Sequence, residues 1–275
     1  MNEPMKMGNY TYALATGTAA AKRLALVESV YGPDAERILG RVGVQSGYRV
    51  VDFGCGTGST LPWFSKQVGE YGEVIALDAS ADQLAIATRN CKSAGLKNIR
   101  FVEASAYTTG LPRESVDLAH CRLVLCHLQN PLDALREMAA VVKPGGVVVC
   151  FDADIAAIFT IPRTECYERM CAIYLERRRL DGLENAMGLK FPAMMAQVGL
   201  VDTEMAFIHP VYLRSEAKRL WEYSFNESEA RTLERNLIGR TELDKLKLEV
   251  AAVAADESIA IAQARMPVCW ARKPA

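Results

Sequence analysis

From residue 48 onward, short apolar runs alternate with longer amphipathic stretches. The apolar runs have the length of buried strands, and each is followed by a stretch with the periodicity of a helix. This alternation is typical of a parallel sheet covered by helices. We therefore expect a doubly wound α/β domain, with strands at about 48–52, 73–78, 99–103, 116–120 and 147–151 and helices at about 58–69, 81–94 and 131–142.

The two ends of the chain have other patterns. Residues 1–45 look helical, and Gly32-Pro33-Asp34 is expected to break the helix before residue 35 because proline removes a backbone donor. The segment 155–190 interleaves aromatic and methionine side chains with a basic cluster. Beyond it we expect a helix at 189–198, a strand at 203–213, a charged helical stretch from 214 to about 264 and a final strand at 264–273.

Composition narrows the class of protein. Of the 275 residues, 50% are hydrophobic and 24% charged, which is ordinary for a soluble globular protein with a sizeable core. A net charge of −1 argues against a large basic surface for nucleic acid. No apolar stretch is long enough for a membrane span and no signal-peptide pattern is visible, so we expect no membrane span and a cytoplasmic protein.

Cysteine spacing points the same way. The eight cysteines are scattered and form no C-x-x-C pair, which favours reduced, buried thiols over disulfides. Cys121 and Cys126 have a suggestive separation, but no second pair completes a zinc site. We expect no bound metal.

The strongest chemical signal follows the first strand. Asp52 closes that strand, and glycines occupy positions 54, 56 and 58. Glycine is needed where the backbone takes a positive φ or lies directly against a ligand, so this spacing predicts a nucleotide pocket. Ser59 stands where a dinucleotide-binding fingerprint has Gly or Ala, and no lysine follows as in a phosphate-binding P-loop.

The D-x-G-x-G-x-G pattern resembles the first motif of the class I S-adenosylmethionine-dependent methyltransferases. Asp78 at the end of the second strand, the run SVDLAHCRLVLCHLQNP at 115–131 and Lys143-Pro144-Gly145-Gly146 also fit that family. The resemblance covers roughly residues 10–155 well and the rest more loosely, and is closest to small-molecule methyltransferases of the ubiquinone/menaquinone-biosynthesis type.

The resemblance implies a fold and a division of the chain. The expected fold is a Rossmann-like, mostly parallel seven-stranded sheet whose last strand is antiparallel, with added N-terminal helices and a helical lid insertion. Residues 1–45 would form an N-terminal helical lid. Residues 46–275 would form the S-adenosylmethionine-binding methyltransferase domain, with substrate-lid insertions at about 155–190 and 214–260.

The resemblance also implies roles for single residues. Asp78 would accept hydrogen bonds from the ribose hydroxyls, and Asp52 would hold either the methionine amino group or the loop itself. Ser105 departs from the family, which usually has Asp there to accept from the adenine amine. The implied cofactor-binding residues are Asp52, Gly54, Cys55, Gly56, Thr57, Gly58, Asp78, Ala79, Gln83, Ser105, Ala106, Cys121, Arg122 and Leu123.

Methyl transfer from a sulfonium depends chiefly on holding the acceptor in line with the breaking bond. A hydroxyl acceptor also benefits from a general base, and His127 is the best candidate, although packing beside the cofactor is an open alternative. His209 is a weaker candidate, and His120, inside the fourth strand, is expected to be buried. Candidate substrate and lid residues, each with simple packing as the alternative, are Tyr10, Tyr12, Phe159, Tyr167, Met170, Tyr174, Met187 and Phe191.

The apolar bias of those candidates favours a small hydrophobic or aromatic acceptor, methylated on O, N or C with S-adenosylhomocysteine as the other product. Arg177, Arg178 and Arg179 offer a site for an acidic substrate, but we expect them to be exposed. A homo-oligomer through the N-terminal or C-terminal helices is possible. One alternative is a nicotinamide-dependent oxidoreductase, but this sequence has no Tyr-x-x-x-Lys pair. A second is a cofactor-binding scaffold without turnover. A third is an RNA or protein methyltransferase, but this sequence lacks the usual motifs of that class.

Overall fold

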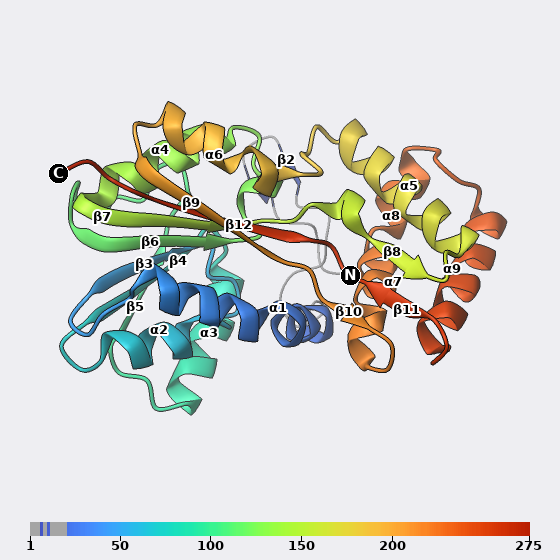
Figure 1. Ribbon diagram of the computed structural model, residues 1–275, viewed down its shortest axis with the longest axis horizontal. Coiled ribbons are helices and arrows are strands. Elements are labelled where there is room, and N and C mark those ends of the chain that lie inside the picture. The colour runs from blue at the N-terminus through green and yellow to red at the C-terminus, as the bar shows by residue number, and fades with distance from the viewer. Residues whose placement is uncertain (1–5, 8–9, 12–20) are drawn as a thin grey trace. The chain divides into compact units, whose positions relative to one another are not determined.

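The computed structural model describes residues 6–7, 10–11 and 21–275, and the side chains of residues 23–275 (Figure 1). The chain divides into two compact units. We call Asp34–Asp152, Met187–Phe207 and Pro267–Ala275 the sheet unit, and Met1–Pro33, Ala153–Ala186 and Ile208–Met266 the helical unit.

The sheet unit contains a seven-stranded sheet in the order β5-β4-β3-β6-β7-β12-β9. Strands β3 to β7 pair in parallel, and β12 pairs antiparallel with β7. This is the mostly parallel doubly wound sheet predicted, with its last strand antiparallel. The bounds are β3 Arg49–Phe53, β4 Glu73–Asp78, β5 Ile99–Glu103, β6 Val116–Arg122, β7 Val142–Phe151, β9 Val201–Ile208 and β12 Met266–Arg272.

Helices cover both faces of this sheet, α2 and α3 on one side and α4 and α6 on the other (Figure 1). The central strands are buried on both faces, which explains their continuous apolar runs. All parallel strands end at the same edge, so the residues that follow β3, β4 and β6 are brought together there. The elements are α2 Leu61–Val68, α3 Ala81–Ser93, the 3₁₀ turn η2 Leu125–His127, α4 Pro131–Val141 and α6 Met187–Gln197.

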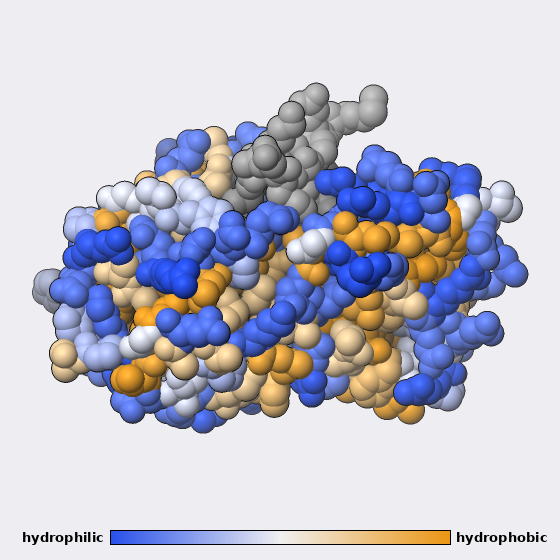
Figure 2. All heavy atoms as spheres, turned by 90° about the horizontal axis from the view of Figure 1, so that it is seen from above, coloured by the Kyte–Doolittle hydropathy of each residue, from blue (hydrophilic) through white to orange (hydrophobic). Residues whose placement is uncertain are grey.

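The helical unit packs helices against a three-stranded antiparallel sheet in the order β10-β11-β8. Phe159, Ile161 and Val211 on its two outer strands are 40%, 53% and 49% exposed. Hydrophobic residues also form patches among hydrophilic ones on the face drawn in Figure 2. The bounds are β8 Phe159–Ile161, β10 Val211–Tyr212, β11 Ala260–Ala262, η3 Ile155–Ala157, α5 Glu165–Leu180, η4 Glu216–Arg219, α7 Leu220–Glu227, α8 Glu229–Glu234 and α9 Arg240–Ala255, and the short hairpin β1 Lys6–Met7 with β2 Tyr10–Thr11 precedes them in the chain.

The predicted break at Gly32-Pro33-Asp34 is wrong, because α1 runs from Ala21 to Val42 with Pro33 inside it. A proline inside a helix costs about 3 kcal/mol in lost hydrogen bonding and steric conflict. Burial of apolar side chains on both sides of the proline, including Val30, Tyr31, Ile38 and Leu39, offsets that cost. The positions of glycine and proline in the sequence do not reveal that burial elsewhere in the fold offsets their cost.

Three other boundaries also differ from the prediction. The segment expected as one strand at 203–213 forms β9 and β10, which belong to different sheets. The stretch expected as helix to about 264 ends at Ala255, and β11 follows it. The turn expected at 143–146 lies inside β7, where the pairing register with β6 shifts between Val116 and Leu118.

Among the helices of residues 21–275, none is long and apolar enough to cross a membrane.

Candidate functional site

The glycine loop after β3 has the backbone conformation that the sequence pattern predicts. Gly54, Gly56 and Gly58 have φ of 66°, 55° and 82°, in the left-handed region that other residues avoid. The loop is tied to the end of β4 because Cys55 N donates to Leu77 O at 2.9 Å. It therefore presents backbone at the edge where the parallel strands end.

The three glycines of the loop have two different roles. A Cβ on Gly54 would lie 2.6 Å from Val124 Cγ2, and one on Gly58 would lie 2.9 Å from Leu61 Cδ1, so these two allow close packing within the protein. Among the residues the structure describes, none has an atom within 4 Å of a Cβ added to Gly56. Gly56 therefore faces open space, as expected where a ligand lies against the backbone.

Asp78, at the end of β4, holds the loop and the next helix together. Its Oδ2 accepts from Gly56 N and its Oδ1 from Ser80 N, each at 2.9 Å. Burial raises the pKa of this carboxyl above its usual value, and these backbone donors only partly oppose that effect. Each oxygen keeps a second lone pair, so the carboxylate can still accept from a diol.

Gln83 in the first turn of α3 adds an unsatisfied polar atom beside Asp78. Its backbone N donates to the Ser80 side chain, which caps the helix. Its Oε1 is buried and, among the residues the structure describes, has no hydrogen-bond partner. Buried polar atoms are rarely left without partners, so the side chain fits a ligand that donates a hydrogen bond. Together with the open space at Gly56, this acceptor fits a nucleoside-containing cofactor.

Asp52 lies behind the loop. Its side chain is 3% exposed and accepts from Thr60 Oγ1 at 2.5 Å, while His120 Nδ1 lies 2.7 Å from its other oxygen. Sequence reasoning placed His120 in the strand but missed this contact, since the pairing register of β3 and β6 is needed to find it.

The loop after β5 is held in a tight turn. Ser105 Oγ accepts from Tyr107 N at 3.2 Å, and Ala106 is 6% exposed. Glu137 of α4 accepts from both the backbone N and the hydroxyl of Thr109, at 3.0 and 2.6 Å. The hydroxyl of Ser105 is thus engaged in its own turn, and the anchoring by Glu137 had no sequence signal.

The end of β6 carries the other implied cofactor residues. Cys121 is fully buried, and a hydrogen bond with the Cys150 thiol, together with burial, raises its pKa, so it stays a neutral thiol. Arg122 Nη2 donates to Ser59 Oγ at 3.0 Å, which links this loop to the glycine loop. Leu123 has φ 57°, a conformation that costs a residue with a side chain about 1–2 kcal/mol. Local strain of this kind often marks functional sites.

His127 ends the turn η2, where its backbone N donates to Val124 O at 3.0 Å. Its side chain is half-buried. It follows the strained Leu123 by four residues and belongs to the sheet unit with the glycine loop.

The candidate substrate residues separate into groups. Tyr167, Met170 and Tyr174 of α5 are buried in the helical unit, whereas Met187 and Phe191 of α6 are buried in the sheet unit. Phe159 is 40% exposed and its ring lies 5.9 Å from that of His209. Tyr10 contributes backbone pairing to β2, and Tyr12 lies outside the described residues. In the helical unit, a crevice too narrow to hold a water molecule is lined by Ile155, Ile158, Met170, Cys171, Tyr174, Trp221 and Phe225.

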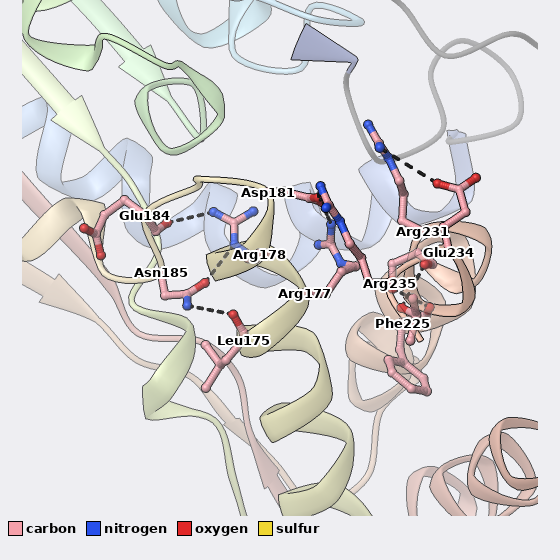
Figure 3. Close-up of polar contacts among 12 residues, drawn as sticks. Leu175, Arg177, Arg178, Asp181, Glu184, Asn185, Phe225, Arg231, Glu234 and Arg235 are labelled. Atoms are coloured by element: carbon pink, nitrogen blue, oxygen red, sulfur yellow. Dashed lines mark hydrogen bonds and ion pairs between the residues drawn. The ribbon is translucent and has the colours of Figure 1, made fainter. Parts of the chain in front are cut away.

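Two of the three arginines of the basic cluster of α5 are buried, contrary to the prediction: Arg177 and Arg178 are 1% and 2% exposed. The side chain of Arg179 is exposed, as predicted. Figure 3 shows the polar contacts around Arg177 and Arg178. Arg177 donates to Asp181 at 2.9 Å, and Arg235 donates to the same carboxylate at 2.7 Å. Arg178 donates to Asn185 Oδ1 at 3.1 Å and to the backbone O of Glu184 at 2.8 Å. Residue type alone did not reveal that these guanidiniums have partners within their own unit.

Comparison with known proteins agrees with this geometry. Residues 51–150 match the family model described as "Methyltransferase domain". The matched residues include the glycine loop, β4, β5, β6 and most of β7, so the similarity covers the edge of the sheet described above.

The demethylmenaquinone methyltransferase of Geobacillus kaustophilus is 32% identical over 124 residues, which cover 45% of this chain and 53% of that protein. The chain thus spans about half the length of the curated relatives it matches.

Solved structures share the fold over most of the chain. A protein from Bacillus halodurans has a TM-score of 0.61 at 18% identity, covering 87% of this chain and 99% of that chain. The [4+2]-cyclase SpnF has a TM-score of 0.52 at 17% identity, covering 95% and 98%. Since a cyclase carries the same architecture, the fold does not fix the reaction.

Proposed function

We propose that this chain is an S-adenosylmethionine-dependent methyltransferase that acts on a small hydrophobic or aromatic metabolite and releases S-adenosylhomocysteine. The observation that carries the proposal is that, among the residues the structure describes, Gly56 faces open space near the half-buried carboxylate of Asp78, and Gln83 Oε1 has no hydrogen-bond partner. These features suit a ligand with a ribose diol and a hydrogen-bond donor. The methyltransferase family match over residues 51–150 supports this choice over other nucleosides.

The cofactor, when bound, supplies a methyl group on a sulfonium. Gly56 would let the backbone lie against it, with Gly54 and Gly58 allowing the tight packing of the loop and Asp78 on the ribose. Ala79, Gln83, Ser105 and Ala106 would border the nucleoside. The backbone of Cys121, Arg122 and Leu123, at the edge where β6 ends, would face the methionine part.

Catalysis then rests on orientation, because the sulfonium leaving group needs little chemical help. The residues around the site hold the acceptor atom in line with the breaking bond and exclude water. If the acceptor is a hydroxyl, the imidazole of His127, the last residue of η2, takes its proton. An unprotonated amine acceptor needs no base, and a carbon acceptor must already be an activated nucleophile.

The acceptor class follows from apolar surface. The helical unit exposes Phe159 and buries Met170, Tyr167 and Tyr174. The similarity to a demethylmenaquinone methyltransferase is consistent with a hydrophobic aromatic acceptor. A nucleic-acid substrate is disfavoured by the net charge of −1, and self-association through the N-terminal or C-terminal helices stays a hypothesis. All eight cysteines are free thiols, which favours a reducing compartment such as the cytoplasm.

The test combines binding with turnover. Isothermal titration calorimetry should show that the wild-type protein binds S-adenosylmethionine and S-adenosylhomocysteine. Asp78→Ala should weaken binding sharply, while Asp82→Ala, at an exposed position of the first turn of α3, should not. Unchanged affinity in Asp78→Ala contradicts the ribose assignment.

Turnover is then measured with methyl-labelled S-adenosylmethionine and hydroxylated aromatic or quinol acceptors, followed by metabolite extracts. Label in a small molecule supports the proposal. Binding without transfer to any pool indicates a cofactor-binding protein without turnover. His127→Ala should lower the rate steeply only if His127 is the base, and a loss confined to cofactor affinity makes it a binding residue.

A further inference from the structure

The buried Asp52 and His120 and the half-buried Thr60 form a hydrogen-bonded set behind the glycine loop, which we call the Thr60–Asp52–His120 cluster. Thr60 Oγ1 donates to Asp52 Oδ2 at 2.5 Å, and His120 Nδ1 lies 2.7 Å from Asp52 Oδ1. The side chains of Asp52 and His120 are 3% and 1% exposed. A carboxylate only accepts hydrogen bonds, so the imidazole donates through Nδ1–H.

The pairing of β3 with β6 fixes where the Asp52 and His120 side chains meet. The two residues lie opposite each other on the neighbouring parallel strands β3 and β6. The ring of His120 lies between Phe64 of α2, at 5.1 Å between ring centroids, and Phe151 of β7, at 5.4 Å. The imidazole is thus held in an apolar layer with its Nδ1 side toward the carboxylate.

The other side of the imidazole is unsatisfied. His120 Nε2 is buried and has no hydrogen-bond partner among the residues the structure describes. Leaving a buried polar atom unpaired costs about 1–3 kcal/mol. If packing were the only requirement, an apolar side chain of similar size would suit this layer better. The cost of burying an unpaired Nε2 is therefore best explained by the hydrogen bond that Nδ1–H donates to Asp52.

The Thr60 side chain binds the Asp52 carboxylate instead of capping its own helix. It is the N-cap residue of α2, yet its side chain makes no cap hydrogen bond. Its hydroxyl turns instead to Asp52, eight residues earlier in the chain. Asp52 and Thr60 flank the glycine loop on its two sides, so their hydrogen bond closes the loop, and His120 fixes the carboxylate that makes this closure.

We propose that His120 is a positioning residue for the methyl-donor site. By donating Nδ1–H to Asp52, it orients the carboxylate that closes the glycine loop and so places the Gly56 backbone against the cofactor. The inference rests on the proposed function, since it assigns His120 to the binding of S-adenosylmethionine. It separates the acidic residue of the glycine motif from direct contact with the ligand.

The decisive comparison is His120→Asn against His120→Leu. The Asn side chain places an amide N–H at the same distance along the side chain as Nδ1, whereas Leu fills the apolar layer without a donor. Calorimetry with S-adenosylmethionine should show affinity within about threefold of wild type for His120→Asn. It should show a loss of about tenfold or more for His120→Leu, from removal of a hydrogen bond to a charged group. In turnover the loss should raise KM for S-adenosylmethionine and leave kcat at saturation nearly unchanged.

A packing role predicts the reverse order, because Leu then fits and Asn leaves a gap and an unpaired oxygen. Equal or better binding by His120→Leu overturns the inference. Should His120→Leu fail to fold, Thr60→Ser and Thr60→Val form a second pair in which only Ser keeps the hydroxyl. In that pair, Val binding as tightly as Ser overturns the role of the cluster.

The state of the imidazole is measured separately. Nitrogen-15 chemical shifts of His120 in the ligand-free protein should show a protonated, hydrogen-bonded Nδ1, and an unprotonated Nδ1 contradicts the inference whatever the protein binds. Absence of S-adenosylmethionine binding in the wild type overturns the proposed function, whereas wild-type binding that His120→Leu retains overturns only the positioning role.

Discussion

Replacing Gly56 with alanine tests whether the open space at the glycine loop belongs to a ligand. Gly56 has φ 55°, and a Cβ added there would meet no protein atom within 4 Å. The substitution therefore costs stability only through the left-handed backbone, about 1 kcal/mol. For a chain of this size that corresponds to a fall in Tm of roughly 2–4 °C.

Gly95 provides the matched control. It has φ 70° and likewise no atom within 4 Å of an added Cβ, but it lies after the end of α3. Gly95→Ala should lose about as much stability as Gly56→Ala, since both residues pay the same backbone cost.

The two variants should differ in cofactor binding. In Gly56→Ala the new methyl group occupies the space assigned to the ligand, so affinity for S-adenosylmethionine should fall by about tenfold or more, equivalent to about 1.4 kcal/mol. Gly95→Ala should bind like wild type. Thermal unfolding and calorimetry on the same preparations measure both quantities. A folded Gly56→Ala variant with wild-type affinity refutes the assignment of this space to the cofactor.

Three further predictions concern packing, buried charge and pH. Gly54→Ala should lose more stability than the Gly95 control, because its Cβ would lie 2.6 Å from Val124 Cγ2, and Val124→Ala should restore part of the loss in denaturant unfolding. Asp181→Asn should cost about 3–5 kcal/mol because it leaves the buried Arg177 without its carboxylate. Glu176→Gln, in an exposed pair, should cost far less, and similar losses in the two variants in denaturant unfolding would contradict this account. Burial raises the pKa of Asp78 above its usual value of 3.8, so the ionised form is disfavoured in the native state. The contribution of Asp78 to stability therefore falls as pH rises from 3.8 through the raised pKa. Binding of S-adenosylmethionine needs the ionised form, so its affinity, measured by calorimetry, should decline on acidification at a higher pH than for an ordinary aspartate. A decline that begins only below the pH range of an ordinary aspartate would argue against Asp78 as the ribose ligand.

The central sheet and the glycine loop were predictable from the sequence because their signals are local. Buried parallel strands appear as uninterrupted apolar runs, and alternate glycines at 54, 56 and 58 correspond to three positive φ values. Asp78 could be placed because β4 follows the loop by one helix, and parallel strands end at the same edge.

The missed features depend on contacts between distant segments. The continuous α1 tolerates Pro33 because of burial that no local pattern reports. Leu123 adopts a left-handed conformation although it is not glycine, held where its N donates to Phe151 O at 2.8 Å. The buried Arg177 donates to Asp181, which also accepts from Arg235, 54 residues away along the chain. Such partners become visible only with the strand and helix packing.

The place of β12 in the sheet has a consequence for the order of folding. β12 lies between β7 and β9, yet residues 209–265, which belong to the helical unit, come between β9 and β12 in the chain. During synthesis, β9 therefore leaves the ribosome well before β12, its neighbour in the sheet, is made. Until then β7 has an open edge and β9 lacks that neighbour, which are conditions that favour binding by chaperones. The edge where β3, β4 and β6 end, which we propose as the methyl-donor site, can assemble before the sheet is complete.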